Sequence, residues 1–260
     1  MVEFTTNQLY ALISAYFWPL VRILGLFTSA PLFSNRAIPG QVRVSLAIGI
    51  TFLVAPTLPA FPEQDPLSWT GLLILTQQFL IGISIGFVMR LIFTGIELAG
   101  EIIGMTMGFG FATFFDPQSQ GRSSSLSQLL AMLTMLFLIA SDFHLLLIEC
   151  VVDSFKSLPI GEAALGKTGF KQLAFWGGEI FMIGLQLSLP AVTALLIANM
   201  ALGVLTRAAP QLNLFGIGFP ITFLTGFLMF DLMLSYWTLP LLDLLQQGIT
   251  MIRQLMQPTL

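Results

Sequence analysis

The ionisable residues inside apolar segments are the residues of this sequence that could carry chemistry. Asp142, His144 and Glu149 lie in one apolar stretch, and ionisable groups in such a setting can relay protons. Asp142 and His144 are two residues apart, however, and would point to different faces of a helix. His144 is the only histidine, so neither a two-histidine metal site nor a multi-histidine relay can form. We therefore interpret His144 as an interior or interfacial histidine with satisfied hydrogen bonds, and the relay is the alternative.

Other reactive groups are equally sparse. The serines at 123–125 offer hydroxyls, but no base lies near them in the sequence, so a loop is the simpler interpretation. Cys150 is the single cysteine, which excludes an internal disulfide and a cysteine metal cage. No basic run could follow a phosphate backbone, so no nucleic-acid partner is expected. The sequence predicts neither an enzyme, nor a metal site, nor a cofactor.

The composition is that of a membrane protein. Of the 260 residues, 56% are hydrophobic and 9% are charged, whereas a soluble domain carries roughly 25% charged residues. No basic residue precedes Arg22, so a cleavable targeting segment is not expected. We predict an all-α, polytopic membrane-type protein built from long, kinked helical hairpins.

The elements that must position these residues are six long apolar stretches. An arginine within such a stretch is costly in lipid, so Arg22 is expected to face protein, water or a headgroup. The number of true spans stays open, because the distribution of basic loops depends on whether residues 96–112 cross the membrane. The predicted stretches are Leu9–Phe33 broken by Pro19, Val44–Leu58, Trp69–Ile92 continuing through Arg90 into Ile96–Ala112, Leu126–Val152, Leu173–Leu205 bent at Pro190, and Leu214–Met256 interrupted by Pro220 and Pro240.

Small residues at helical spacing predict close packing between helices. Gly100, Gly104, Gly108 and Ala112 recur at every fourth position, and Gly82 and Gly86 form a second patch. Residues four apart lie on one helix face, where glycine lets another backbone approach. Glu97 and Glu101 also lie one turn apart, and because like charges at this spacing repel, at least one of them should have a polar partner or water.

The first row of small residues leads into an aromatic segment and a polar, glycine- and serine-rich loop ending near Ser125. Irregular backbone at membrane depth is tolerated only where protein buries it or where it lines a water-filled cavity. Bulky side chains there could form a constriction that blocks a pore, or they could simply pack against a helix end. The candidate plug residues are Met105, Met107, Phe109, Gly110, Phe111, Phe114, Phe115, Asp116 and Pro117.

Two stretches resemble one known family. They are PLFSNRAIPGQVRVSLAI at residues 31–48 and QLSLPAVTALLIANMALGVLTRAAPQLNLFGIGFP at residues 186–220. Both look like the R subunit of the bacterial flagellar type III export gate, the FliR-like proteins, and the resemblance extends over essentially the whole chain. The second stretch carries the more specific elements, and the injectisome branch shares the fold. The signature residues of this second stretch are Pro190, Asn199, Gly203, Arg207, Pro210, Gln211, Asn213, Gly218 and Pro220.

The resemblance implies a division of the chain and a set of partners. Residues 1–157 would be similar to the P subunit and include the plug loop near 106–125, residues 158–171 would form a linker, and residues 172–260 would form a hairpin similar to the Q subunit. The chain would join P-type and Q-type subunits around a pore for unfolded flagellar substrates. Contacts with the B-type switch subunit, the A-type export subunit and membrane lipid are also implied, at the inner membrane within the flagellar basal body.

The alternative is a multipass transporter, or a lipid-handling membrane enzyme, that acts alone. A lone transporter usually shows two similar halves. The halves of this sequence differ in loop length, proline placement and charge, so the resemblance and the sequence both favour a pore subunit without chemistry of its own.

Overall fold

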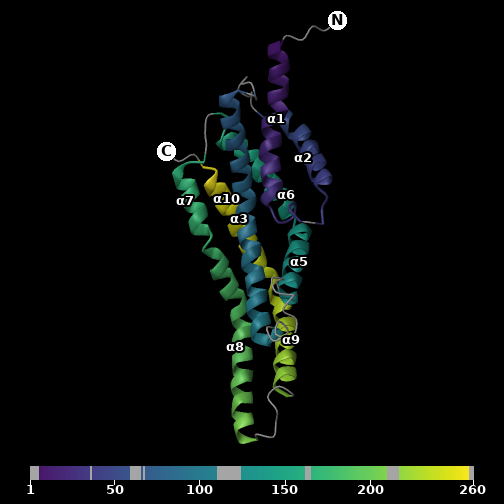
Figure 1. The fold of residues 1–260 in the computed structure, drawn as a ribbon, viewed down its shortest axis with the longest axis vertical. Helices are drawn as coiled ribbons and strands as arrows, with labels where there is room; N and C mark the ends of the chain where they lie inside the picture. The colour runs from purple at the N-terminus through teal and green to yellow at the C-terminus, as the bar shows by residue number, and fades with distance from the viewer. Residues whose placement is uncertain are drawn as a thin grey trace. The chain divides into compact units, whose positions relative to one another are not determined.

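The computed structural model describes residues 6–35, 37–58, 66, 68–109, 124–161, 165–209 and 217–257, with side chains from Ser14 onward. Every regular element in these ranges is a helix, which confirms the predicted all-α class (Figure 1). Four helical stretches of the described chain are long and apolar enough to cross a membrane, and the pair α5 and α6, bent by 69°, could form a fifth span. The predicted polytopic membrane character is therefore supported by both length and composition.

The helices follow most of the predicted apolar stretches. The segments predicted on either side of Arg90 form one continuous helix of 39 residues, α3. The elements in chain order are α1 Thr6–Ser29, α2 Gly40–Val54, the short 3₁₀ helix η1 Ala55–Thr57, α3 Trp69–Met107, α5 Ser125–Ala140, α6 Phe143–Ser157, α7 Lys167–Trp176, α8 Glu179–Ala208, α9 Phe219–Tyr236 and α10 Thr238–Leu255.

Several predicted breaks were misplaced. Helix α1 runs through Pro19 without interruption, because an interior proline removes one N–H and bends a helix without always ending it. The stretch predicted at 126–152 is instead divided at Asp142, whose φ of 57° is left-handed and cannot continue a right-handed helix. The stretch at 173–205 is divided after Trp176, and the stretch at 214–256 is divided at Trp237.

Packing divides the chain into two compact units, each assembled from separate segments. Unit 1 contains Met1–Leu91, Leu138–Gly177 and Leu245–Leu260, and unit 2 contains Ile92–Phe137 and Gly178–Leu244. Helices α3, α5 and α10 each contribute residues to both units. The division into residues 1–157, 158–171 and 172–260 rests on the family resemblance and not on packing. It stays a prediction.

In unit 1, glycines bring α1 and α3 close together. A Cβ added to Gly82 would overlap the carbonyl oxygen of Arg22, and a Cβ added to Gly86 would overlap the hydroxyl of Ser29. On the α1 side, a Cβ on Gly25 would lie 2.6 Å from the carbonyl oxygen of Phe79. Any larger residue at these three positions would have to displace backbone, so the two helices can cross at this separation only with glycine.

The same crossing buries a positive charge. Arg22 is fully buried, and its Nε donates to Oε1 of Gln78 at 2.8 Å, with a second bond from Nη2 to the same oxygen. Its Nη1 donates to Oγ of Ser154 at 2.9 Å, and its Nη2 donates to the carbonyl oxygen of Leu158 at 2.9 Å. The guanidinium carbon lies 4.0 Å from the ring centroid of Phe155. Arg22 therefore faces protein, one of the three environments predicted for it.

The partners of Arg22 compensate its charge through dipoles. Leu158 is the C-cap residue of α6, so its carbonyl belongs to the negative end of that helix. Gln78 adds an amide oxygen, and Phe155 adds the negative face of an aromatic ring. One side chain of α1 is thus bonded to α3 and to α6.

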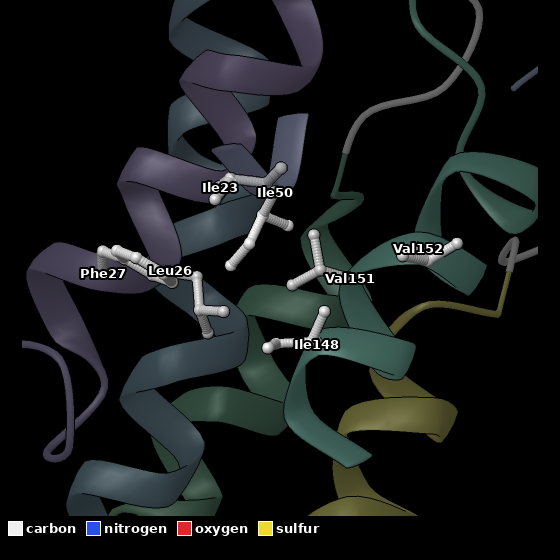
Figure 2. Close-up of a pocket in the computed structure, with 7 residues that line it drawn as sticks. All are labelled: Ile23, Leu26, Phe27, Ile50, Ile148, Val151 and Val152. Atoms are coloured by element: carbon white, nitrogen blue, oxygen red, sulfur yellow. The ribbon is translucent and has the colours of Figure 1, made fainter. Parts of the chain in front are cut away.

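A small apolar pocket lies where α1, α2 and α6 meet, and Figure 2 shows the side chains of all three helices converging on it. Cys150 is also buried in α6. The core of unit 1 therefore combines apolar contacts with the buried guanidinium of Arg22. The pocket is lined by Ile23, Leu26, Phe27, Ile50, Ile148, Val151 and Val152.

Unit 2 contains the hairpin of α8 and α9, which pack against one another (Figure 1). Glycines again permit the close contacts. A Cβ on Gly95 of α3 would lie 2.8 Å from Cβ of Ile183, and a Cβ on Gly184 of α8 would lie 2.8 Å from a methyl carbon of Leu98. Helices α3 and α8 therefore interlock through one glycine from each side.

Replacing Arg22 by methionine should destabilise unit 1 strongly. The variant leaves the oxygens of Gln78, Ser154 and Leu158 buried without their donor, and breaking a buried polar cluster in this way costs about 3–5 kcal/mol. Thermal unfolding of the purified protein in mild detergent measures the loss. The double variant Arg22→Met/Gln78→Leu should recover part of it, because an apolar pair needs no hydrogen bonds. Arg253→Met, at a largely exposed position, serves as the control and should change little. A midpoint for Arg22→Met equal to that of the control would contradict this role.

Candidate functional site

The strongest candidate site lies in unit 2, where the end of α3 meets the start of α5. Here the chain leaves α3 for the predicted plug loop and returns from it. A Cβ on Gly100 would lie 2.6 Å from Cα of Ser127, and a Cβ on Gly104 would lie 3.1 Å from Oγ of Ser124. The first turn of α5 is therefore seated directly on the backbone of α3.

Hydrogen bonds stabilise the contact between α3 and α5. The carboxylate of Glu101 accepts the backbone N–H of Ser124 at 2.9 Å, and the hydroxyl of Ser127 donates to the carbonyl oxygen of Glu97 at 2.8 Å. Within α5, the hydroxyl of Ser124 accepts the backbone N–H of Ser127 at 3.2 Å, which is the geometry of an N-cap. Glu101 thus has the polar partner predicted for one of the two glutamates, and its negative charge lies at the positive end of α5.

The cap at Ser124 was missed by the sequence analysis, which assigned the serines at 123–125 to a loop. Ser124 followed by an apolar run beginning at Leu126 matches the signature of a helix start, with Ser127 rather than Glu or Gln at the third helical position. This signal could have been found without a structure.

Gly108 does not continue the row of close-packing residues that was predicted. Helix α3 ends at Met107, and Gly108 has a φ of 97°, in the left-handed region that glycine adopts at the ends of helices. The predicted continuation of the helix to Ala112 is therefore wrong, and Gly108 terminates the helix instead of extending the row of Gly100 and Gly104. Ala112 itself lies outside the described residues.

The three described members of the candidate plug have different surroundings. Met107 is fully buried, and its side chain fills the space beside Gly226 of α9, where a Cβ would overlap it. The ring centroid of Phe109 lies 5.2 Å from that of Phe223, which in turn contacts the rings of two neighbours on α9. Met105 is 57% exposed. The remaining candidates, Gly110, Phe111, Phe114, Phe115, Asp116 and Pro117, lie outside the described residues.

The signature residues of the second family-like stretch lie on the α8–α9 hairpin. Pro190, Asn199, Gly203 and Arg207 are all exposed on α8, and a Cβ on Gly203 would meet nothing within 4 Å. Their contacts within the described chain do not explain why these residue types stand there. Gly218 is buried just before α9, and Pro220 occupies its first turn, where a proline fits because the N–H there has no helical acceptor. Pro210, Gln211 and Asn213 lie outside the described residues.

The proposed proton-relay residues of unit 1 are not brought together. Asp142 is exposed at the break before α6, whereas His144 lies in its first turn. Glu149 is 3.7 Å from Nη2 of Arg253, in a largely exposed ion pair. In the described part of the chain, no group of three histidine, cysteine, aspartate or glutamate side chains could hold a metal ion. The structure provides no geometry for a relay among these three residues.

Much of the apolar surface is exposed. Only 17% of the apolar window in Gly40–Thr57 is buried, against 22% for α9, 33% for Lys167–Ala208 and 67% for α3. On α8, the side chains of Phe181, Met200 and Val204 are each about two-thirds exposed or more. Surfaces of this kind are stable only against lipid or other protein chains.

Comparison with known proteins identifies relatives over most of the chain. Residues 13–248 match the family described as bacterial export proteins, family 1. The flagellar biosynthetic protein FliR of Escherichia coli strain K12 is 44% identical over 87% of this chain and 86% of its own length. The protein of the same name from Pectobacterium carotovorum is 43% identical over 90% of this chain and 89% of its own length. The one from Bacillus subtilis strain 168 is 27% identical over 88% and 89%.

Replacing Glu101 should loosen the contact between α3 and α5. Glu101→Ala removes the acceptor of the Ser124 N–H, and a hydrogen bond to a charged group contributes roughly 1.5–3 kcal/mol. Glu101→Gln keeps a carbonyl oxygen at the same distance and should retain most of the stability, which makes it the matched control. Thermal unfolding and limited proteolysis between α3 and α5 measure the difference. Equal losses for alanine and glutamine would show that a neutral acceptor for the Ser124 N–H does not stabilise the contact and that the charge of Glu101 does, and no loss in either variant would contradict the role of Glu101.

Proposed function

This chain belongs to the FliR family of bacterial export proteins, and we propose that it is a non-enzymatic subunit of the flagellar type III export gate in the bacterial inner membrane. With P-type and Q-type subunits it would form the pore through which unfolded flagellar substrates pass. The observation that carries the proposal is the family match over residues 13–248 together with 44% identity to a flagellar biosynthetic protein over most of both chains.

The exposed surfaces of the chain support a role within an assembly. Helices α8 and α9 carry large apolar side chains that their own unit does not cover, including Leu224 at 74% exposed and Leu228 at 60% exposed. The signature residues Asn199, Gly203 and Arg207 are likewise exposed. Neighbouring P-type and Q-type subunits would cover part of this surface and lipid the rest, with the B-type switch subunit and the A-type export subunit as further partners.

The loop near residues 106–125 would act as the plug of the pore. Its two ends are held firmly in unit 2, by Met107 and Phe109 against α9 and by the Glu101–Ser124 hydrogen bond beside α5. A segment anchored at both ends can change position in the middle without releasing its base. Apolar side chains within a pore block conduction by excluding water.

Deleting Gly110–Phe115 should open the closed gate without preventing assembly. The anchoring contacts of Gly100, Gly104 and Glu101 remain in this variant, whereas the bulk that would exclude water is gone. We expect normal yield of the complex with P-type and Q-type subunits, together with leakage of small ions across the membrane. Alanine at Phe111, Phe114 and Phe115 should act in the same direction but more weakly, because the backbone would still obstruct.

Complex yield and ion conductance should be measured on the same preparations. If these phenylalanines were packing residues, each change to alanine would cost roughly 3–5 kcal/mol. Assembly would then fail without leakage, and that outcome would remove the plug from the proposed function. Intact gates from which the whole segment is missing and which still do not leak would also contradict it.

Arg207→Leu should weaken assembly more than Arg253→Leu. Arg207 lies in the last turn of α8 and forms no ion pair in the described chain, so its charge is available to a neighbouring subunit. Arg253 already lies near Glu149, within the same unit. The readout is the amount of P-type and Q-type subunit that co-purifies with each variant, and equal amounts would argue against an assembly role for Arg207.

A further inference from the structure

Helix α7 uses only one narrow face for packing within unit 1. Gly169 and Leu173, one turn apart, are its buried residues. A Cβ on Gly169 would lie 2.7 Å from a methyl carbon of Leu165 and 3.5 Å from a methyl carbon of Leu255. The rest of this ten-residue helix is exposed or half-buried.

The opposite face of α7 combines positive charge with exposed aromatic rings. Lys167 and Lys171 are one turn apart and lie about half a revolution from Gly169 and Leu173. Phe170 and Phe175 flank the two lysines on either side of this face, with 46% and 73% of their surfaces exposed. The ammonium nitrogen of Lys171 lies 5.8 Å from the ring centroid of Phe175. Exposed phenylalanines on an otherwise charged helix face are costly in water alone.

The two lysines of this face have no acidic partner within the described chain. All three lysines of the sequence lie between residues 156 and 171, a range that contains one acidic residue, Glu162. Lys156 is bonded to Asp153 at 3.2 Å. Lys167 and Lys171, by contrast, form no ion pair among the described residues, so their two positive charges remain available to an anionic partner.

The position of α7 in the sequence indicates which partner this is. The helix is separated by only Gly177 and Gly178 from α8, and the stretch Lys167–Ala208 is one of the candidate membrane spans. The polar end of such a span lies at the membrane–water interface, where aromatic rings sit at the level of the headgroups and lysines attract anionic lipid.

We propose that the outer face of α7 binds the headgroups of anionic phospholipids at the membrane surface. Lys167 and Lys171 pair with lipid phosphates, while the rings of Phe170 and Phe175 insert between the headgroups. Lipid binding here requires neither a plug nor a neighbouring subunit, so it goes beyond the proposed function and can hold where that function fails.

The test measures which lipid the protein retains. The full chain, with the subunits that co-purify in mild detergent, is mixed with equal amounts of phosphatidylglycerol and phosphatidylcholine, and bound lipid is counted by native mass spectrometry. The wild type should retain phosphatidylglycerol in preference. Lys167→Gln/Lys171→Gln should lower this preference by roughly 5-fold per lysine. Lys156→Gln is the matched control, since that lysine already has a carboxylate partner, and should leave the preference unchanged.

Two further variants separate charge from folding and from apolar insertion. Lys167→Arg/Lys171→Arg keeps the charge and should retain the preference, so a loss confined to the glutamine variant is not a failure to fold. Phe170→Ser/Phe175→Ser should lower retention of both lipids with little change in their ratio. The proposal is overturned if the glutamine variant keeps the wild-type preference, if the arginine variant loses it, or if the glutamine variant sheds a co-purifying protein while its lipids are unchanged.

Discussion

A buried cation that has no buried anion among the described residues is the constraint on which unit 1 depends. The guanidinium of Arg22 can be held away from water only if several dipoles converge on it, because an uncompensated charge in such an environment costs several kcal/mol. Gln78, Ser154, Leu158 and Phe155 supply those dipoles from α3 and from the end of α6. Each partner must therefore lie at one distance and one orientation, which sets the register of three helices. The apolar contacts around the pocket of Figure 2 have no preferred direction, whereas the hydrogen bonds of this cluster require one.

In unit 2, the corresponding constraint is a close contact between the backbones of α3 and α5. Glycines at 100 and 104 bring two backbones together, and a carboxylate and two hydroxyls then close the contact. The side chains of Leu130 and Phe109 also lie beside these two glycines, so the contact combines close backbones, hydrogen bonds and apolar packing. Met107 and Phe109 secure the other side by filling the surface of α9.

The sequence predicted the features that arise from local chemistry. Helical class, the close packing implied by small residues, a protein environment for Arg22 and a polar partner for one glutamate all follow from residue type and spacing. The break at Asp142 did not follow, because no glycine or proline marks it, whereas the break at Trp237 lies three residues before Pro240, where an interruption was predicted. Conversely, Pro19 was predicted to break the first helix, but α1 continues through it. At the candidate site, the end of α3 was misplaced because Gly108 fits both a packing row and a helix terminus, and only its φ decides between them.

The interleaved construction of unit 1 has a consequence for the order in which the protein can fold. Its last segment begins at Leu245, whereas its preceding segment ends at Gly177. The intervening residues belong to unit 2, and at roughly 5–20 residues per second their synthesis takes on the order of seconds. During that interval Gly169 lacks Leu255, and Glu149 lacks Arg253. The nascent chain must therefore keep an incomplete core beside the ribosome until its final helix emerges. A chain truncated before α10 would leave this core open to proteases and chaperones.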